Sequence, residues 1–94
     1  MALSQPATFN EEWSDARVMA YLNHLPPQGE NADYAVLYNA FKHMRPHDFE
    51  RLLTQFVADG RDIHAKNLHG QSIAEVISQF PRQKQAYLEI IAKF

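Results

Sequence analysis

The sequence predicts an all-α protein made of five short helices. Five segments carry apolar residues at the three- and four-residue spacing of a helix face, and no window shows sustained alternation with a period of two. Proline or glycine separates most of these segments, at points where helices commonly end. A chain of 94 residues has the length of a single domain.

The first helix is expected over residues 13–25, before the stop signal Pro-Pro-Gln-Gly. Ser14 is placed to cap the free amides of the first turn, and Asp15 complements the positive end of the helix. Trp13 lies five residues before Val18, the arrangement of a hydrophobic staple. The apolar positions of this helix are Val18, Tyr21, Leu22 and Leu25.

Two longer helices follow. The second begins at Asn31 or Ala32 and ends near Arg45. Pro46 suits the first turn of the third helix, since the amide that proline lacks has no partner there. Gly60 ends the third helix as the residue after its cap. The two apolar stripes are Tyr34, Leu37, Tyr38, Phe41 and Met44, and then Phe49, Leu52, Leu53, Phe56 and Val57.

The last two helices have weaker boundaries. Ser72 and Glu75 have the spacing of a capping box, which predicts the start of the fourth helix. Pro81 breaks this helix, and a fifth is expected to begin at about Gln83. Their apolar stripes are Ile73, Val76, Ile77 and Phe80, and then Tyr87, Ile90, Ile91 and Phe94.

Composition and charge disfavour several classes of protein. The hydrophobic fraction of 46% and the charged fraction of 21% are those of an ordinary globular domain. A net charge of −2 gives no electrostatic drive toward nucleic acid or anionic lipid, so neither nucleic acid nor a membrane is an expected partner. The absence of cysteine excludes disulfides and thiolate ligands.

The ends of the sequence suggest a simple organisation. Residues 1–9 are polar and aperiodic and are expected to form a flexible N-terminal arm, with residues 10–94 as a single helical domain. The N-terminus has no leader pattern, and no segment approaches the roughly 20 apolar residues of a membrane-spanning helix. The cytoplasm is therefore the expected location.

The segment from Phe49 to Ser72 has the residue order of the junction between two ankyrin repeats. An apolar helix ends in Gly-Arg-Asp-Ile-His-Ala from Gly60 onward, and a second glycine, Gly70, precedes the next helix start. This order resembles the ankyrin consensus, in which a helix ends in Gly-Ala-Asp-Val-Asn-Ala and the next repeat opens with Asp-x-x-Gly-x-Thr-Pro-Leu. It departs from the consensus where Ile73-Ala74-Glu75 replaces Pro-Leu-His.

The resemblance implies two ankyrin-like helical hairpins joined by a projecting loop at residues 60–72. In this loop Ile63 and Ala65 are expected to point inward, while Asp62 and Asn67 bond loop amides. The hairpins recur at an offset of 38 residues, against about 33 in ankyrin repeats. Two hairpins are fewer than the roughly three repeats usually needed, so the N-terminal helix is expected to cap the first. The opening Glu11-Glu12-Trp13-Ser14-Asp15, together with Met44-Arg45-Pro46 and Phe49-Glu50-Arg51, also looks like a family of short uncharacterised bacterial proteins, and this resemblance implies no assigned activity.

Five histidines raise the question of a metal site or a catalytic site. His43 and His47 straddle the predicted helix break, which removes the shared helix face that two ligands need, and His64 and His69 lie in the loop. Structural or surface roles are therefore favoured for all the histidines. No glycine-rich phosphate loop is present, and two serines are explained as helix caps. We expect no catalytic residue, no metal site and no cofactor, and hence no enzyme.

The sequence favours a non-catalytic protein–protein interaction module that uses the 60–72 loop and the adjoining helix. By analogy with the variable tips of ankyrin repeats, the predicted partner-binding residues are Arg61, Lys66, Leu68, His69 and Gln71. One alternative is a self-associating structural or accessory protein, in which the segment from Tyr87 to Phe94 forms a weak homodimer. The other is a small metal-binding or enzymatic domain that uses the histidines.

Overall fold

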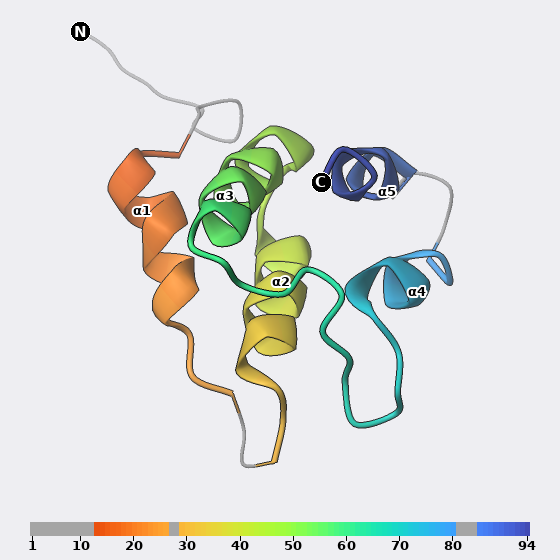
Figure 1. The fold of residues 1–94 in the computed structure, drawn as a ribbon. Coiled ribbons are helices and arrows are strands. Elements are labelled where there is room, and N and C mark those ends of the chain that lie inside the picture. The colour runs from red at the N-terminus through yellow and green to blue at the C-terminus, as the bar shows by residue number, and fades with distance from the viewer. Residues whose placement is uncertain (1–12, 27–28, 81–84) are drawn as a thin grey trace, which may run out of the picture.

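The computed structural model describes residues 13–26, 29–80 and 85–94, and within these ranges the chain is helical and contains no β-strand. The helices are α1 (Asp15–Ala20), α2 (Ala32–His43), α3 (Pro46–Ala58), α4 (Ile73–Ile77) and α5 (Gln85–Ile91), and a 3-10 turn, η2 (Tyr21–Asn23), follows α1 (Figure 1). The all-α class is confirmed. The arm predicted at residues 1–9 lies outside the described residues.

The predicted helix starts are confirmed wherever they fall in the described residues. Ser14, Asn31 and Ser72 precede α1, α2 and α4, and the side-chain oxygen of each accepts a hydrogen bond from an amide of the first turn. Ser72 and Glu75 form the full reciprocal capping box. Pro46 is the first residue of α3. The predicted start of the fifth helix at Gln83 lies outside the described residues, and α5 is described from Gln85.

The prediction that the first helix reaches Leu25 is wrong. The amide of His24 donates to the carbonyl oxygen of Tyr21 at 3.2 Å, and His24 itself is extended, with φ −62° and ψ 129°. Pro26 disfavours helical angles at the residue before it, so the chain tightens into a 3-10 turn and leaves the helix early. Leu25 is consequently 84% exposed and takes no part in the core.

Two other helices also end before their predicted limits. α2 ends at His43 instead of Arg45, because Pro46 favours extended angles at Arg45 and the chain is already extended one residue earlier. α4 ends at Ile77, although the apolar spacing continues to Phe80. The amide of Phe80 instead closes a turn on the carbonyl of Ile77 at 2.9 Å. In α2 the last apolar residue, Met44, is the cap, and its amide still donates to the carbonyl of Ala40 at 2.8 Å, whereas in α4 the apolar spacing continues to Phe80 after the helical hydrogen bonds have ended.

The helices form two hairpins that lie side by side. The first hairpin is α2 with α3, and the second is α4 with α5. α2 contacts α4, and α3 contacts α5 (Figure 1). On the other side of the first hairpin α1 contacts α3, while η2 contacts both α2 and α3. The N-terminal helix therefore covers the first hairpin, as the sequence predicts.

One apolar core is shared by all five α-helices. The fully buried residues of α3 in this core are Phe49, Leu52, Leu53 and Phe56. Tyr87 of α5 joins the hairpins, because its hydroxyl donates to the main-chain carbonyl oxygen of Met44 at 2.5 Å. This hydrogen bond satisfies an acceptor that is buried away from water.

A charged cluster fastens α1 to α3. Asp48 is fully buried in the first turn of α3, and the Arg51 guanidinium donates to its Oδ1 at 3.0 Å and to the carbonyl oxygen of Trp13 at 2.8 Å. Arg51 also pairs with Asp15, and Arg45 Nη2 lies 3.4 Å from Asp48 Oδ2. The buried carboxylate is therefore compensated by two guanidinium groups.

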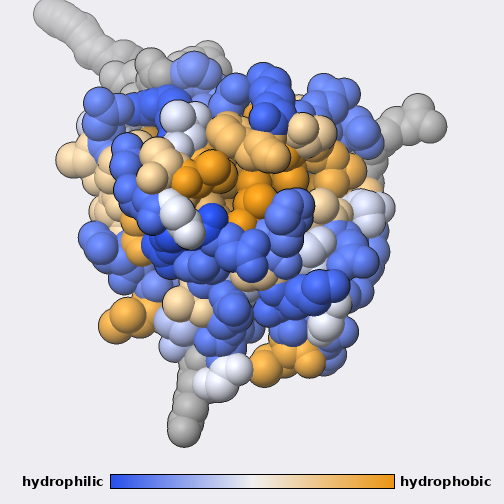
Figure 2. Space-filling model, in the orientation of Figure 1, coloured by the Kyte–Doolittle hydropathy of each residue, from blue (hydrophilic) through white to orange (hydrophobic). Residues whose placement is uncertain are grey.

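Apolar side chains also gather at the surface over α3 and α5 (Figure 2). Val57 near the end of α3 and Phe94 just after α5 are each 39% exposed, and Ile91 is half-buried. Val57 belongs to the apolar stripe of α3 but lies at its open edge.

Candidate functional site

The 60–72 loop begins with a well-defined helix stop. Gly60 has φ +80°, a left-handed conformation that glycine adopts without strain. Its amide donates to the carbonyl of Val57 at 2.9 Å, and the amide of Arg61 donates to the carbonyl of Phe56 at 3.2 Å. These two bonds are those of a Schellman motif, which fixes the direction in which the loop leaves α3.

Asn67 shapes the tip of the loop. Its side-chain oxygen accepts hydrogen bonds from the amides of His69, at 2.8 Å, and Gln71, at 3.0 Å. Its amide nitrogen Nδ2 donates to the hydroxyl of Tyr34 on α2 at 3.3 Å. Gly70 closes the turn with φ +78°, and its amide donates a hydrogen bond to the carbonyl oxygen of Asn67 at 3.0 Å. One side chain therefore folds the tip and ties it to the neighbouring helix.

The base of the loop is held by an ion pair with α2. Arg61 Nε donates to Asp33 Oδ1 at 2.7 Å, the amide of Asp62 donates to Asp33 Oδ2 at 3.0 Å, and Arg61 Nη1 donates to the carbonyl of Leu22 at 2.8 Å. Burial alone would raise the pKa of the Asp33 carboxyl, but the hydrogen bonds from Asp62 and Arg61 outweigh it and hold that pKa below its ordinary value.

The inward and outward pattern of the loop agrees with the prediction. Ile63 and Ala65 are buried, and Asp62 accepts a hydrogen bond from the amide of His64 at 2.8 Å. Lys66 and Ser72 face each other in a single antiparallel bridge at the base of the tip. The loop is therefore a rigid projection, in which backbone hydrogen bonds and buried apolar residues fix the position of the exposed side chains.

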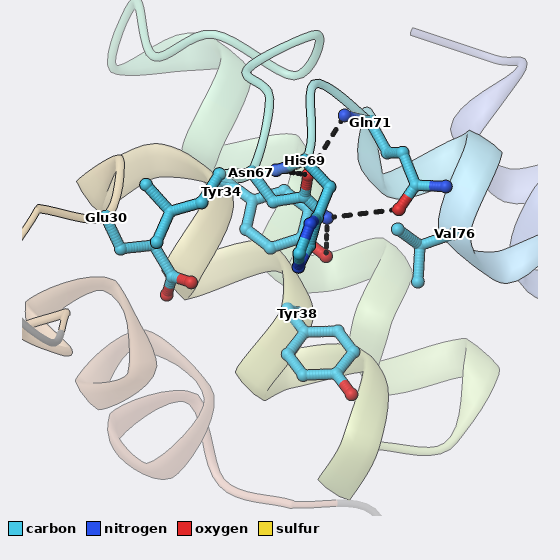
Figure 3. A pocket seen from close by; sticks show the side chains of 8 residues that line it. Glu30, Tyr34, Tyr38, Asn67, His69, Gln71 and Val76 are labelled. Carbon is cyan, nitrogen blue, oxygen red and sulfur yellow. Dashed lines mark hydrogen bonds between the residues drawn. The ribbon is translucent and has the colours of Figure 1, made fainter.

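A hollow of about 260 Å³ lies between this projection, α2 and α4 (Figure 3). Its lining residues come from the turn before α2, from α2, from the loop and from α4: Glu30, Tyr34, Tyr38, Asn67, Leu68, His69, Gln71 and Val76. A second hollow of about 300 Å³ shares Glu30 and Tyr38 with the first and continues along α2 to Lys42 and His24. We refer to these two neighbouring hollows together as the α2 groove.

Two tyrosines from adjacent turns of α2 line the first hollow. The rings of Tyr34 and Tyr38 are nearly parallel, with 13° between their planes and 5.9 Å between their centroids. Tyr34 is buried and Tyr38 is half-buried. Burial raises the pKa of the Tyr34 hydroxyl, although the hydrogen bond from Asn67 acts in the opposite direction. Tyr34 therefore presents a neutral phenol, fixed by Asn67.

The structure brings together three of the five predicted partner-binding residues. Leu68, His69 and Gln71 line the first hollow, and Leu68 is 70% exposed at the tip of the loop. Lys66 is exposed on the loop but outside the lining. The guanidinium of Arg61 instead donates to Asp33 and to the carbonyl of Leu22, contacts inside the protein that hold the base of the loop.

Sequence reasoning did not find the α2 side of the groove. Tyr34 and Tyr38 follow the apolar stripe of the second helix, and this pattern favours core or boundary positions. Their four-residue spacing places both on one helix face, but only the folded loop shows that this face borders a hollow. Glu30 and Val76 carry no sequence signal for a site.

The histidines do not converge on one point. His43 ends α2, where its Nδ1 lies 3.0 Å from the carbonyl oxygen of Asn39, and His47 lies beyond the helix break in α3. His64 and His69 are exposed on the loop. Across residues 13–26, 29–80 and 85–94, no group of three or more His, Asp or Glu side chains is arranged to hold a metal ion.

No family model, curated protein or solved structure matches this chain significantly. The ankyrin resemblance therefore stays a prediction from residues 49–72, alongside the helical hairpins that the structure describes. In the part of the chain that the structure covers, no helix has both the length and the apolar character to cross a bilayer.

Proposed function

We propose that the chain is a non-catalytic protein-interaction module that binds a segment of a partner protein in the α2 groove. The observation that carries the proposal is the position of Leu68. This apolar side chain is 70% exposed on a rigid loop, and it borders a hollow whose other wall holds two stacked tyrosines. Aromatic residues beside an exposed apolar residue are typical of the centre of a protein interface.

The rigidity of the loop supports this function. Asn67 and the pair between Asp33 and Arg61 hold the loop without a partner, so binding does not require the backbone to be ordered first. Less conformational entropy is then lost on association, which favours affinity. Binding residues that sit on loops of a rigid scaffold are common for this reason.

The size of the groove also favours a protein segment over a small molecule. Each hollow has a volume of about 260 or 300 Å³, at or below the lower end of the roughly 300–1,000 Å³ typical of sites for drug-sized ligands. Two adjoining hollows along one helix suit consecutive side chains of an extended or helical segment. The proposed setting is the cytoplasm, with no cofactor.

Affinity capture from cells that naturally express the chain tests the proposal. The bait is the tagged wild-type chain, compared with Leu68→Glu, which sets a carboxylate at the groove, and with Val57→Glu, which makes the same change on the α3 and α5 surface. We expect Leu68→Glu to lose proteins that the wild type and Val57→Glu both retain. Equal capture by all three folded baits would refute a role for the groove.

A second candidate function, self-association, is favoured by the apolar surface over α3 and α5 (Figure 2). Val57, near the end of α3, and Phe94, just after α5, are both exposed, and a second copy packed against these two elements would cover apolar side chains of this kind. Sedimentation of the wild type and of Val57→Glu at high micromolar concentration tests it. A dimer that Val57→Glu abolishes would support self-association, and a wild-type monomer would exclude it.

A further inference from the structure

We infer that the first hollow of the α2 groove binds a cationic side chain, arginine or lysine, of the partner segment, with the Glu30 carboxylate and the tyrosine rings as its contacts. This inference rests on the proposed function and names the chemistry of the partner at that site. It follows from the charge, the aromatic lining and the size of the hollow.

The charge of the lining favours a cation. Glu30 is the one Asp, Glu, Lys or Arg residue among the eight lining residues, so its carboxylate sets the charge of the hollow. Within the described residues Glu30 has neither a hydrogen bond nor an ion pair. Glu30 as a residue is half-buried, and attraction to a positive charge is stronger there than at a fully exposed position. An unpaired negative charge in a hollow favours a cation.

The two tyrosine rings of the lining also favour a cation. A cation is attracted to the face of a tyrosine ring within about 6 Å of its centroid. One of these rings already has such a contact, since the ammonium nitrogen of Lys42 lies 5.1 Å from the centroid of the Tyr38 ring. Lys42 lines only the second hollow, which leaves the first hollow without a lysine or arginine of its own. Tyr34 and Tyr38 together with Glu30 thus provide both kinds of contact that an ammonium or guanidinium group makes.

The arrangement of these groups also suits one long cationic side chain. Glu30 and Gln71 lie on opposite sides of the tyrosines, and the His69 side chain is seen in front of Tyr34 (Figure 3). A volume of about 260 Å³ suits one long side chain more than a large ligand. Leu68 next to the hollow would contact an apolar neighbour of the cation in the partner segment.

An NMR titration of the full chain with synthetic peptides tests the inference. The probes are three capped pentapeptides of sequence Ala-Leu-X-Leu-Ala, in which X is arginine, citrulline or glutamate. Citrulline keeps the shape of arginine and removes its charge. We expect the arginine peptide to shift the Tyr34 and Tyr38 ring signals, and the citrulline and glutamate peptides to bind at least about fivefold more weakly.

Variants of the chain identify the contact. Glu30→Gln keeps the shape of the side chain and is expected to weaken the binding of the arginine peptide by about fivefold or more. Glu89→Gln, at an exposed position on α5, is the matched control and is expected to change nothing. His69→Lys places a competing cation beside the hollow and is expected to weaken the binding of the same peptide.

The inference is overturned if the arginine and citrulline peptides bind equally, if Glu30→Gln has no effect, or if the arginine peptide shifts no tyrosine signal at about 1 mM. A stronger response to the glutamate peptide overturns it as well. The captured proteins separate this failure from failure of the proposed function. If Leu68→Glu loses them and Glu30→Gln keeps them, the groove binds a partner by other chemistry; if both variants keep them, the proposed function itself fails.

Discussion

The ion pair between Asp33 and Arg61 is expected to set how firmly the 60–72 loop is held to α2. Asp33→Ala removes the acceptor of two hydrogen bonds, from Arg61 Nε at 2.7 Å and from the Asp62 amide at 3.0 Å. Arg61→Ala removes the first of these and also the bond of 2.8 Å to the carbonyl of Leu22. A double-mutant cycle isolates the part that the two side chains share.

The expected magnitude follows from the geometry and the exposure. A hydrogen bond to a charged group contributes about 1.5–3 kcal/mol, and the side chains of Asp33 and Arg61 are 27% and 23% exposed, which favours the lower part of that range. Because Asp33→Ala removes two such hydrogen bonds, we expect it to lower the free energy of unfolding by about 2–3 kcal/mol in total. The expected coupling energy is about 1–1.5 kcal/mol, above the roughly 0.2–1 kcal/mol of exposed ion pairs.

Urea unfolding followed by circular dichroism measures these energies. The control is the pair between Glu50 and Lys93, whose charged atoms lie 2.9 Å apart at an exposed site. Its coupling energy is expected to stay within about 0.5 kcal/mol. A coupling energy for Asp33 and Arg61 no larger than that of the control would refute the reasoning that this pair anchors the loop.

The same ion pair predicts a defined acid sensitivity. The pKa of Asp33 is lowered in the folded chain from an ordinary value of 3.8, so its carboxylate contributes stability that is fully present above that value. This contribution is lost as the pH falls through the lower pKa of the folded state. The difference in unfolding free energy between the wild type and Asp33→Asn should therefore be constant near neutral pH and shrink below about pH 4. A difference that stays constant down to about pH 2 contradicts the shift.

Three further substitutions test separate parts of the fold. Tyr87→Phe leaves the Met44 carbonyl without this donor and is expected to cost about 1–3 kcal/mol in urea unfolding, whereas the control Tyr38→Phe should cost less than about 0.5 kcal/mol. Asn67→Ala removes four side-chain hydrogen bonds of the loop tip, so hydrogen exchange should become faster at the amides of His69 and Gln71, and unchanged rates would refute its role. Gly60→Ala forces a side chain into φ +80° and should lower the unfolding free energy by about 1–2 kcal/mol. An unchanged unfolding free energy would contradict this strain.

The helix starts were accessible to sequence reasoning because each depends on one or two nearby residues. A capping serine or asparagine, or a proline in the first turn, acts within three residues of itself, as at Ser14, Asn31, Pro46 and Ser72. Helix ends were less accessible. Apolar spacing continues beyond the last hydrogen bond when a side chain contacts the core from a turn, as Phe80 does with its ring 5.2 Å from that of Phe41.

The groove shows the same division between local and distant information. The loop residues could be predicted, because two glycines, Asp62 and Asn67 have local roles in turns. The opposite wall could not be predicted, because Tyr38 and Leu68 are far apart in the sequence and only the fold brings them to the same hollow. The role of Arg61 was also hidden, since only the fold places Asp33 beside it.

At the tip of the loop, the residues that fix the backbone differ from the residues that are exposed, and this separation affects how the loop can change through evolution or engineering. The backbone of the tip is fixed by Asn67 and Gly70, while Lys66 and Leu68 point their side chains into solvent. Substitutions at these two exposed positions should each alter stability by less than about 0.5 kcal/mol. Recognition can therefore be varied without rebuilding the scaffold, so the loop offers two sites for a combinatorial library that keeps the fold constant.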